Sequence, residues 1–526
     1  MALSEHLSRP AASPAASWLT SPGPGTLFTG LILVLTTLVT GAFALSVSQW
    51  TPLVLAALPL LALNAAWVSG GAATSLIGLL RPAEPMPLPA THWTPSGRTA
   101  ILVLLCKEDP GAVATYLRDL RASLDRAGLD RTTSIFVLSD TSGDDLVPRE
   151  AEAMRDLVAD GTLQYRRRAQ NTGRKPGNIA DWLDTQGDAF DYMLILDADS
   201  RMSAGRIRRL IYQIETRPRT GLIQAGMALI PAQSRFGQLQ RTSVRLMSAN
   251  FGRGTAAWAG RNGNYWGHNA IIRIAAFRNA ARLPHLSGRA PFGGPLLSHD
   301  FIEAAWIRRD GWSVELDPDL TGSAEDAPQT LDAFHRRDRR WCQGNLQHLF
   351  MLTTPGLHPV SRFHLASGVL SYLAAPIWLL LVILMASGAV PVASALPFAL
   401  IAVVLILPKL CALAGRIARD RTARRQWLSL RAWTAELVLS SLVAPIMMIR
   451  QTGAVLSVVS GRDCGWKSGR TARWQPPRGL PESVAGLAIA ALAAFSDAGA
   501  TLWLAPLILP LLAAPLLVRL LDASPR

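Results

Sequence analysis

The chain has 526 residues, of which 52 are Lys or Arg and 37 are Asp or Glu, so its formal charge is +15. Only 17% of the residues are charged and 49% are hydrophobic, whereas a soluble globular protein carries about 25% charged residues. This composition excludes a simple soluble protein, a disordered chain and a fibre.

The apolar residues gather at the two ends of the chain. Residues 1–25 are rich in Ser, Ala and Pro, which predicts a disordered head. Residues 26–80 contain no charged side chain, and each of their two apolar stretches is long enough to cross the about 30 Å of a bilayer core. We therefore predict two transmembrane helices within 26–81. We reject a removable signal peptide, because the first apolar stretch is too long and the residues before it are weakly basic.

The middle of the chain, residues 95–350, has the composition of a soluble enzyme domain. Four short apolar runs end in polar residues, as the strands of a buried, mostly parallel sheet do. These runs are 99–109, 133–140, 192–199 and 221–227. The segments with helical spacing between them are 111–127, 148–159, 175–186 and 203–217. This alternation predicts a Rossmann-like α/β domain that binds its ligands at the carboxyl ends of the strands.

After residue 350 the apolar pattern returns. Two transmembrane helices are predicted within 363–415 and a transmembrane hairpin at 483–520. Between them lie two basic loops, and positive residues mark the cytoplasmic side. The basic residues of these loops are Arg416, Arg419, Arg421, Arg424 and Arg425, then Arg450, Arg462, Lys467, Arg470, Arg473 and Arg478. The segment 431–461 lies between two cytoplasmic flanks, so we predict interfacial or re-entrant helices broken near Pro445.

The sequence therefore predicts a multi-pass α-helical membrane protein whose cytoplasmic α/β domain is inserted between transmembrane helices. This topology, together with a lipid bilayer that contains anionic lipid, explains most of the positive charge. Nucleic acid is not an expected partner, because no nucleic-acid-binding motif accompanies the charge.

Acidic residues end two of the predicted strands. Asp197 and Asp199 close the most apolar strand, and two carboxylates at this spacing can hold Mg²⁺ and, through it, phosphate oxygens. The alternative is a solvated strand end. Asp140 ends another strand, where an acid can bind a nucleotide base or ribose but is also common by chance.

Basic residues crowd the segment 166–178, at a predicted helix start that suits a diphosphate. They include Arg166, Arg167, Arg168, Arg174 and Lys175, with Asn171, Gly177 and Asn178 among them. A solvated basic face is the alternative for this segment.

Two later segments also carry groups suited to catalysis. Asp300 either caps the helix that follows it or acts as a general base. Arg337 and Arg340 can neutralise a leaving diphosphate, and Trp341 offers a flat face to a sugar ring. The alternative for this second segment is an aromatic belt at the membrane interface.

In their order, these residues resemble the motifs of processive family 2 glycosyltransferases with the GT-A fold, such as cellulose and hyaluronan synthases. The motifs are D, DxD, (T/H)(E)D and (Q/R)xxRW, at Asp140, Asp197/Asp199, Asp300 and Arg337-x-x-Arg340-Trp341. More narrowly, five segments resemble the glucan glucosyltransferase H family, which makes the β-1,2-linked backbone of osmoregulated periplasmic glucans in Gram-negative bacteria. They are RRRAQNTGRKPGNIADW, LDADSRM, GNYWGHNAIIR, LSHDFIEAA and RRDRRWCQGNLQH. Arg337 in place of the usual glutamine, and His299 before Asp300, fit the narrower family.

The resemblance implies a role for each matching residue. Asp300 is the catalytic base and Arg340 faces the diphosphate. Asp197 and Asp199 hold the metal and the diphosphate, and Asp140 contacts the uridine. The other implied nucleotide-sugar contacts are Lys175, Asn178 and Arg337, and the implied acceptor contacts are Tyr265, Trp266, His268 and Trp341.

The resemblance also implies an activity. It points to an inverting glucosyltransferase of the bacterial inner membrane that uses UDP-glucose and Mg²⁺ or Mn²⁺ to extend a growing glucan acceptor. The residues leave open whether the protein exports its product alone or passes it to a periplasmic glucan-processing partner. Another processive β-glucan synthase and a transferase to a lipid phosphate are alternatives. A sensor that binds nucleotide sugar without turnover is disfavoured by the intact motifs.

Overall fold

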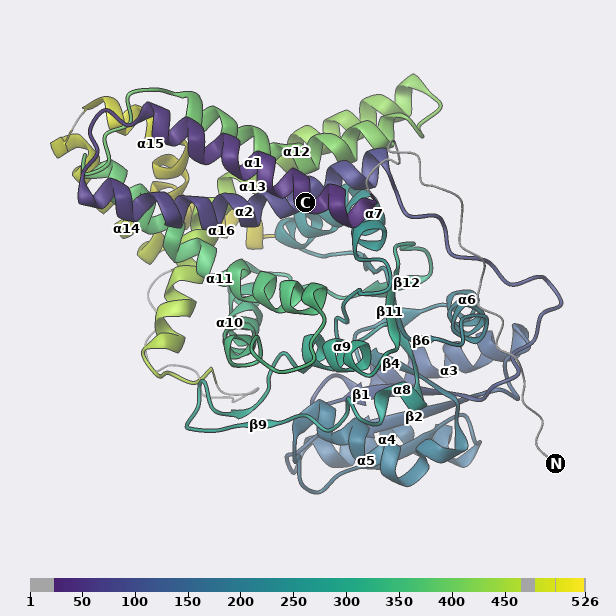
Figure 1. Cartoon of the computed structure of the whole chain (residues 1–526). Coiled ribbons are helices and arrows are strands. Elements are labelled where there is room, and N and C mark those ends of the chain that lie inside the picture. The colour runs from purple at the N-terminus through teal and green to yellow at the C-terminus, as the bar shows by residue number, and fades with distance from the viewer. Residues whose placement is uncertain (1–22, 465–477, 497, 525–526) are drawn as a thin grey trace, which may run out of the picture.

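The computed structural model describes residues 23–464, 478–496 and 498–524. The predicted disordered head falls almost entirely outside these ranges, as do Lys467, Arg470 and Arg473 of the second basic loop. The described chain forms two layers, a layer of long helices and an α/β domain packed beneath it (Figure 1). The α/β domain lies between helical segments in the sequence, as the α/β insertion predicts.

A seven-stranded sheet forms the centre of the α/β domain, in the order β11-β6-β8-β4-β1-β2-β3. Its strands are β1 (Thr99–Leu105), β2 (Thr133–Ser139), β3 (Gln164–Arg167), β4 (Tyr192–Asp197), β6 (Thr220–Ala225), β8 (Ala270–Arg273) and β11 (Ser313–Asp317). Neighbouring strands are parallel except β8, which runs antiparallel to both β4 and β6. The four predicted strands are confirmed, while β3, β8 and β11 are additions to the prediction.

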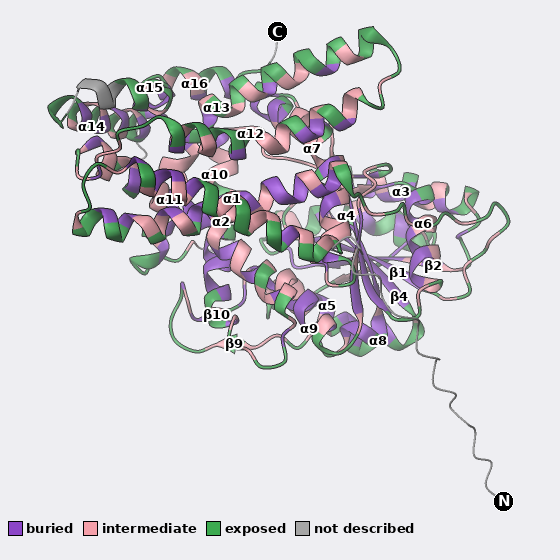
Figure 2. Ribbon diagram, turned by 45° about the horizontal axis from the view of Figure 1, so that its top comes forward, coloured by how far each residue is buried: buried purple, intermediate pink, exposed green. Residues whose placement is uncertain are grey.

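Both faces of this sheet are covered. Along β1, Leu102 and Leu104 pack into one hydrophobic cluster and Ile101 and Val103 into another, which explains the continuous apolar run in the sequence. Figure 2 shows the central strands as buried. The four helices predicted between strands are confirmed as α3 (Pro110–Arg126), α4 (Leu146–Ala159), α5 (Arg174–Gln186) and α6 (Ala204–Glu215).

Smaller elements complete the domain. A three-stranded sheet contains β5 (Arg201–Met202), β12 (Ser323–Glu325) and β7 (Ala228–Leu229), and β9 (His285–Leu286) pairs with β10 (Gly294–Pro295). The remaining helices of the domain are α7 (Arg235–Ala259), α8 (Ile274–Phe277), α9 (His299–Arg309) and α10 (Leu331–Gln347), with short 3₁₀ turns at Gly187–Ala189 and His348–Phe350.

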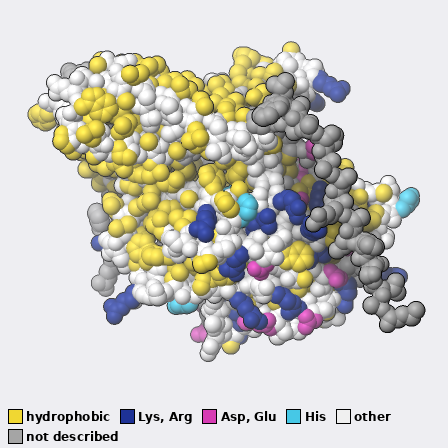
Figure 3. Space-filling view, viewed as in Figure 1, with side chains coloured by type: hydrophobic (Ala, Val, Ile, Leu, Met, Phe, Trp, Pro, Cys, Tyr) yellow, Lys and Arg dark blue, Asp and Glu magenta, His cyan; other side chains and the backbone are white. Residues whose placement is uncertain are grey.

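Five helices of the upper layer are long and apolar enough to cross a membrane. They are α1 (Pro24–Ser46), α2 (Pro52–Leu80), α11 (Pro359–Ala386), α12 (Leu396–Ile417) and α13 (Ala423–Val459). The C-terminal helices are α14 (Leu480–Ser496), α15 (Ala498–Leu512) and α16 (Ala514–Asp522), and the chain bends by 52° between Leu502–Leu512 and α16. Figure 3 shows hydrophobic side chains over the upper layer and charged side chains over the α/β domain.

Helix α13 differs from the predicted pair of helices broken near Pro445. It is one continuous helix of 37 residues that contains Pro445. A proline removes one backbone hydrogen bond, but membrane helices tolerate it where neighbouring groups satisfy the freed carbonyl, and Pro445 is buried within the protein. Helix α13 also contacts the α/β domain, because Ser243 of α7 donates to Glu436 at 2.8 Å and Arg450 pairs with Asp332 of α10 at 3.0 Å.

Two glycines join the upper layer to the α/β domain. A Cβ on Gly254 of α7 would lie 1.9 Å from the Thr74 carbonyl oxygen of α2, and one on Gly78 would lie 2.1 Å from the Asn250 carbonyl oxygen. The two helices therefore touch backbone to backbone, which only small residues permit. This contact fixes α2 against α7, the helix that leads from the sheet to the segment of Tyr265, Trp266 and His268.

Candidate active site

A pocket of about 530 Å³ opens at the carboxyl ends of β1, β2 and β4. It brings together ten of the twelve predicted site residues, which derive from both halves of the domain. They are Asp140, Lys175, Asp197, Asp199, Trp266, His268, Asp300, Arg337, Arg340 and Trp341. The parallel register of β2, β1 and β4 accounts for the meeting of Asp140 and Asp197 at one edge of the sheet.

Arg168 holds Asp140 in place. Its Nε donates to Asp140 Oδ1 at 2.8 Å and its Nη2 to Oδ2 at 3.0 Å, which is a bidentate pair. The same guanidinium pairs with Asp181 of α5 at 2.7 Å and donates to the Arg174 carbonyl oxygen at 3.0 Å. Arg168 therefore orients Asp140 and the loop before α5. From the sequence, Arg168 could be recognised only as one member of a basic run.

The start of α5 lies at the pocket wall. Gly173 and Arg174 adopt positive φ angles of 68° and 55°, which turn the chain into the helix. A Cβ on Gly177 would lie 2.1 Å from the Thr172 carbonyl oxygen, so the first turn of α5 requires glycine there. Arg174 and Lys175 line the pocket. A helix N-terminus with two cations suits a diphosphate.

The two carboxylates of the DxD motif have unequal environments. Burial alone would raise the pKa of Asp197, but the positive charges of Lys175 and His268 outweigh it and lower the pKa to about 2. Lys175 Nζ contacts the Asp197 carboxylate directly. Loss of hydration in the pocket and the charge of Asp197 raise the pKa of Asp199. The charges of His268 and Arg337 oppose that rise, and a cation bound at this pair would further favour the ionised form of Asp199.

A divalent cation fits this pair only with help from the substrate. Among the described residues, no group of three or more His, Cys, Asp or Glu side chains could hold a metal ion. Mg²⁺ typically takes one or two carboxylates and completes its shell with water and substrate phosphates. Asp197 and Asp199 meet that requirement.

Asp300 lies in the first turn of α9 but does not cap it, since Ser298 occupies the N-cap position. Gly267, between Trp266 and His268, lies beside this carboxylate: its φ of 89° favours glycine, and a Cβ there would be in ordinary van der Waals contact with Asp300 Oδ2, at 3.5 Å. Burial raises the pKa of Asp300, and the positive charge of His299 opposes that rise. A carboxylate with a raised pKa beside an open pocket suits proton abstraction.

His299 is held beside Asp300 by a buried acid. Its Nδ1 lies 3.0 Å from Glu303 Oε1, one turn along α9. Burial would lower the pKa of His299, but the charge and hydrogen bond of Glu303 outweigh it and raise that pKa. The imidazolium form of His299 is thereby favoured next to Asp300.

Two exposed tryptophans give the pocket an aromatic side. Trp266 is 38% exposed and Trp341 is 44% exposed, although both belong to otherwise well-packed segments. The guanidinium of Arg337 lies 4.3 Å from the centroid of the Trp341 ring, which fixes the ring plane. Exposed aromatic faces at this position suit the flat apolar face of a sugar.

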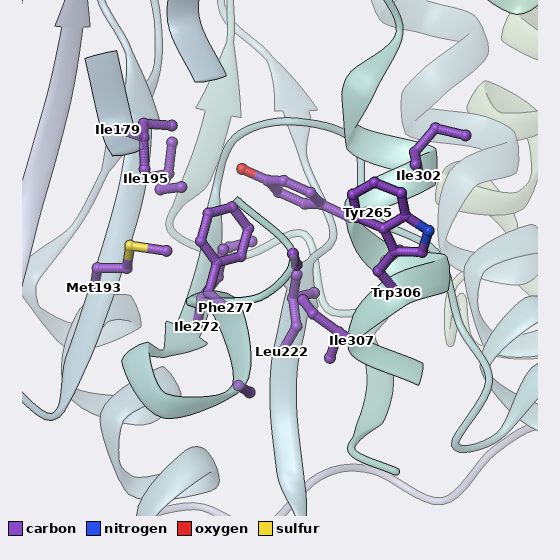
Figure 4. Close-up of a cluster of buried hydrophobic side chains, with 14 of the residues drawn as sticks. Ile179, Met193, Ile195, Leu222, Tyr265, Ile272, Phe277, Ile302, Trp306 and Ile307 are labelled. Atoms are coloured by element: carbon purple, nitrogen blue, oxygen red, sulfur yellow. The ribbon is translucent and has the colours of Figure 1, made fainter. Parts of the chain in front are cut away.

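Tyr265 and Asn178, which the resemblance implies as ligand contacts, do not line the pocket. Tyr265 is fully buried among core side chains such as Phe277 and Trp306 (Figure 4), and its hydroxyl donates to the Gly267 carbonyl oxygen at 2.6 Å. Asn178 is also fully buried, and its carbonyl oxygen accepts from Arg166 at 2.8 Å. Each lies within three residues of a residue that lines the pocket, but its own side chain is buried.

The pocket also contains an acid that the sequence did not indicate. Glu325 ends β12 and lies between His268 and Arg337. It follows the segment TGSA with no pattern around it, so no sequence signal marks it.

Comparisons with known proteins identify relatives of this chain. Residues 192–414 match the model of glycosyl transferase family group 2. A glucans biosynthesis glucosyltransferase H from Bradyrhizobium diazoefficiens is 40% identical over 490 residues, which cover 85% of this chain and 65% of that protein. The relative of the same name from Vibrio cholerae is 39% identical over 79% of this chain and 62% of its own length. The chain thus spans a little under two thirds of these relatives.

Solved structures are more distant. The mannosyltransferase PcManGT from Pyrobaculum calidifontis, solved with GDP-Man and Mn²⁺, is 13% identical over 82% of this chain and 99% of that one, with a TM-score of 0.43. At that score the likeness supports no inference about ligands. The curated relatives and the family model carry the assignment. The chain is similar to glucans biosynthesis glucosyltransferases H over about four fifths of its own length, and its residues 192–414 match glycosyl transferase family group 2.

Proposed function

We propose that this protein is an inverting glucosyltransferase that polymerises glucose from UDP-glucose into the β-1,2-linked backbone of osmoregulated periplasmic glucans. The observation that carries the proposal is the pocket, in which a DxD pair, a buried acid and an arginine–tryptophan pair face one another. The names of the curated relatives support the choice of glucose and of glucan as product.

The residues divide the reaction between them. Asp300 accepts the proton of the acceptor hydroxyl as that oxygen attacks the anomeric carbon in line, and the bond to UDP breaks. Lys175 and Arg340 stabilise the negative charge on the departing diphosphate. Mg²⁺ or Mn²⁺, bound by Asp197 and Asp199, supplies further charge stabilisation when present. One inversion at the anomeric carbon makes the β-linkage from an α-linked donor, so no second nucleophilic carboxylate is required.

A second cavity supports product transfer toward the membrane. It measures about 890 Å³, adjoins the pocket at Trp266 and Trp341, and is lined by helices of the upper layer. Besides Trp266 and Trp341, its aromatic lining residues are Phe28 of α1, Trp67 of α2, Phe251 and Trp258 of α7, Phe301 of α9 and Phe363 of α11. We call this cavity the membrane chamber. A glucan leaving the pocket would enter it directly.

The proposed location is the bacterial inner membrane, with the catalytic domain in the cytoplasm. The basic loop after α12 supports this orientation, since Arg416 and Arg419 lie at the end of α12 that faces the α/β domain. Helix α13 contacts that domain through Glu436 and, near its end, through Ser457, which supports a place at the membrane interface instead of a crossing. The glucan is then delivered to the periplasm, either by this protein alone or with a periplasmic glucan-processing partner.

The test is synthesis by the purified protein. Full-length protein in detergent is supplied with radiolabelled UDP-glucose and Mg²⁺, and the product is separated and its linkages are determined. We expect UDP release and a water-soluble β-1,2-glucan. A β-1,4 product would move the protein to another branch of β-glucan synthases. Label in a lipid extract would identify a lipid-phosphate transferase, and donor binding without UDP release would refute an enzyme.

A further inference from the structure

Glu325 lies where the nucleotide-sugar pocket and the membrane chamber meet, and its side chain lines both. Strand β12 places it there, because Ala324 pairs with Arg201 of β5, directly after the DxD motif. The other neighbour of β12 is β7, where Glu325 pairs with Leu229. This short sheet therefore fixes Glu325 relative to the metal-binding acids.

The contacts of Glu325 leave its carboxylate able to bind a ligand. Its Oε2 lies 3.4 Å from His268 Nε2 and 3.6 Å from Arg337 Nη2. Both distances exceed the usual 2.7–3.2 Å of an N–H···O hydrogen bond. Arg337 in turn stacks over Trp341. The carboxylate is thus held by charge in a fixed place and retains oxygen lone pairs for hydroxyl donors.

A role as a metal ligand does not fit Glu325. With Asp197 and Asp199 it would make a third acid for a cation, but the described residues contain no such group of three. Its surroundings point to the acceptor instead. Among the described residues that line the membrane chamber, Glu325 is the one acid, at the end nearest the pocket.

We propose that Glu325 is an acceptor-binding residue that accepts hydrogen bonds from hydroxyl groups of the terminal sugar of the glucan. This rests on the proposed function. A carboxylate beside an exposed tryptophan is a pairing suited to a sugar, since the ring face packs on the aromatic side chain and the hydroxyls donate to the oxygens. Glu325 thereby orients the attacking hydroxyl toward Asp300, while the donor binds on the other side of the DxD motif.

The test separates acceptor use from donor use. Full-length wild type, Glu325→Gln, Glu325→Asp and Asp326→Asn are purified in detergent with Mg²⁺. UDP release is measured with UDP-glucose alone and with added β-1,2-linked glucose oligosaccharide. Asp326→Asn is the matched control, because Asp326 is the next residue along the chain, caps its own loop through Ala327 and lines neither cavity.

For Glu325→Gln we expect the KM for the oligosaccharide to rise about tenfold or more, since a hydrogen bond to a charged group is lost. The KM for UDP-glucose should change by less than about threefold, which is under 1 kcal/mol by RT ln. Glu325→Asp should recover part of the loss, and Asp326→Asn should match the wild type. An unchanged acceptor KM, or a change confined to the donor KM, would overturn this inference alone. Absence of UDP release from the wild type would overturn the proposed function and this inference with it.

Discussion

Arg450 of α13 is placed to hold the catalytic helix α10 against the C-terminal hairpin. Its Nη1 pairs with Asp332 at the start of α10 at 3.0 Å, and its Nε pairs with Glu482 of α14 at 2.6 Å. The Arg450 and Glu482 side chains are only 9% and 4% exposed. Asp522 at the end of α16 adds a hydrogen bond from the Leu331 backbone at 2.9 Å. Helix α10 carries Arg337, Arg340 and Trp341.

We predict that Arg450→Met destabilises the protein by about 3–5 kcal/mol, because it leaves Glu482 buried without its partner. The double variant Arg450→Met, Glu482→Met should recover most of that loss, since a buried ion pair replaced by an apolar pair of similar volume is often neutral. Arg155→Met is the control. Its partner Glu152 is 64% exposed, so the pair contributes at most about 1 kcal/mol.

The measurement is denaturant or thermal unfolding of each purified variant in the same detergent, followed by helix content. The order of stability expected is wild type and Arg155→Met highest, the double variant next, and Arg450→Met lowest. Equal losses for Arg450→Met and Arg155→Met would contradict the reasoning. So would a double variant that is less stable than Arg450→Met alone.

Further predictions follow from the helix contact, the charges and the cation. Gly254→Ala should destabilise the protein by about 1–3 kcal/mol, because the added Cβ would meet the Thr74 carbonyl oxygen. Gly30→Ala should not, because a Cβ there would have no atom within 4 Å. The unfolding midpoints of both variants check this. Activity should fall as the pH is lowered through the raised pKa of Asp300, because the protonated acid cannot accept a proton. His299→Gln should move that fall to higher pH, because it removes the positive charge that opposes the rise of the Asp300 pKa. A pH–rate profile of His299→Gln that moves to lower pH would contradict this. Chelation of divalent cations should stop UDP release, and added Mg²⁺ should restore it; full activity in chelator would exclude a metal role.

The sequence predicts the part of the fold that depends on local patterning. Four buried strands and the helices between them are visible in it, because apolar runs and helical spacing alternate from residue 99 to 227. Strand β8 is not visible in the sequence. It has only four residues, Ala270–Arg273, and is recognisable only through its antiparallel pairing with β4 and β6. The continuity of α13 through Pro445 depends on its neighbours and could not be read from the sequence either.

The candidate site shows the same division. Residues that end strands or start helices, such as Asp140, Asp197 and Asp300, are predictable because topology brings those ends together. The place of Tyr265 could not be predicted, because motif membership does not reveal which way a side chain points, and its ring packs into the core. Glu325 was missed because its position depends on a three-stranded sheet whose strands are two or three residues long.

The rate of UDP release by Asp300→Asn tests the central claim most directly. Asparagine keeps the shape of the side chain but cannot accept the proton, so we predict a fall of about 100-fold or more with UDP binding retained. The structure provides Asp188→Asn as a comparison, because Asp188 is an exposed acid of the turn Gly187–Ala189 that pairs with Arg278 and lies outside the pocket. Undiminished UDP release by Asp300→Asn would contradict the account.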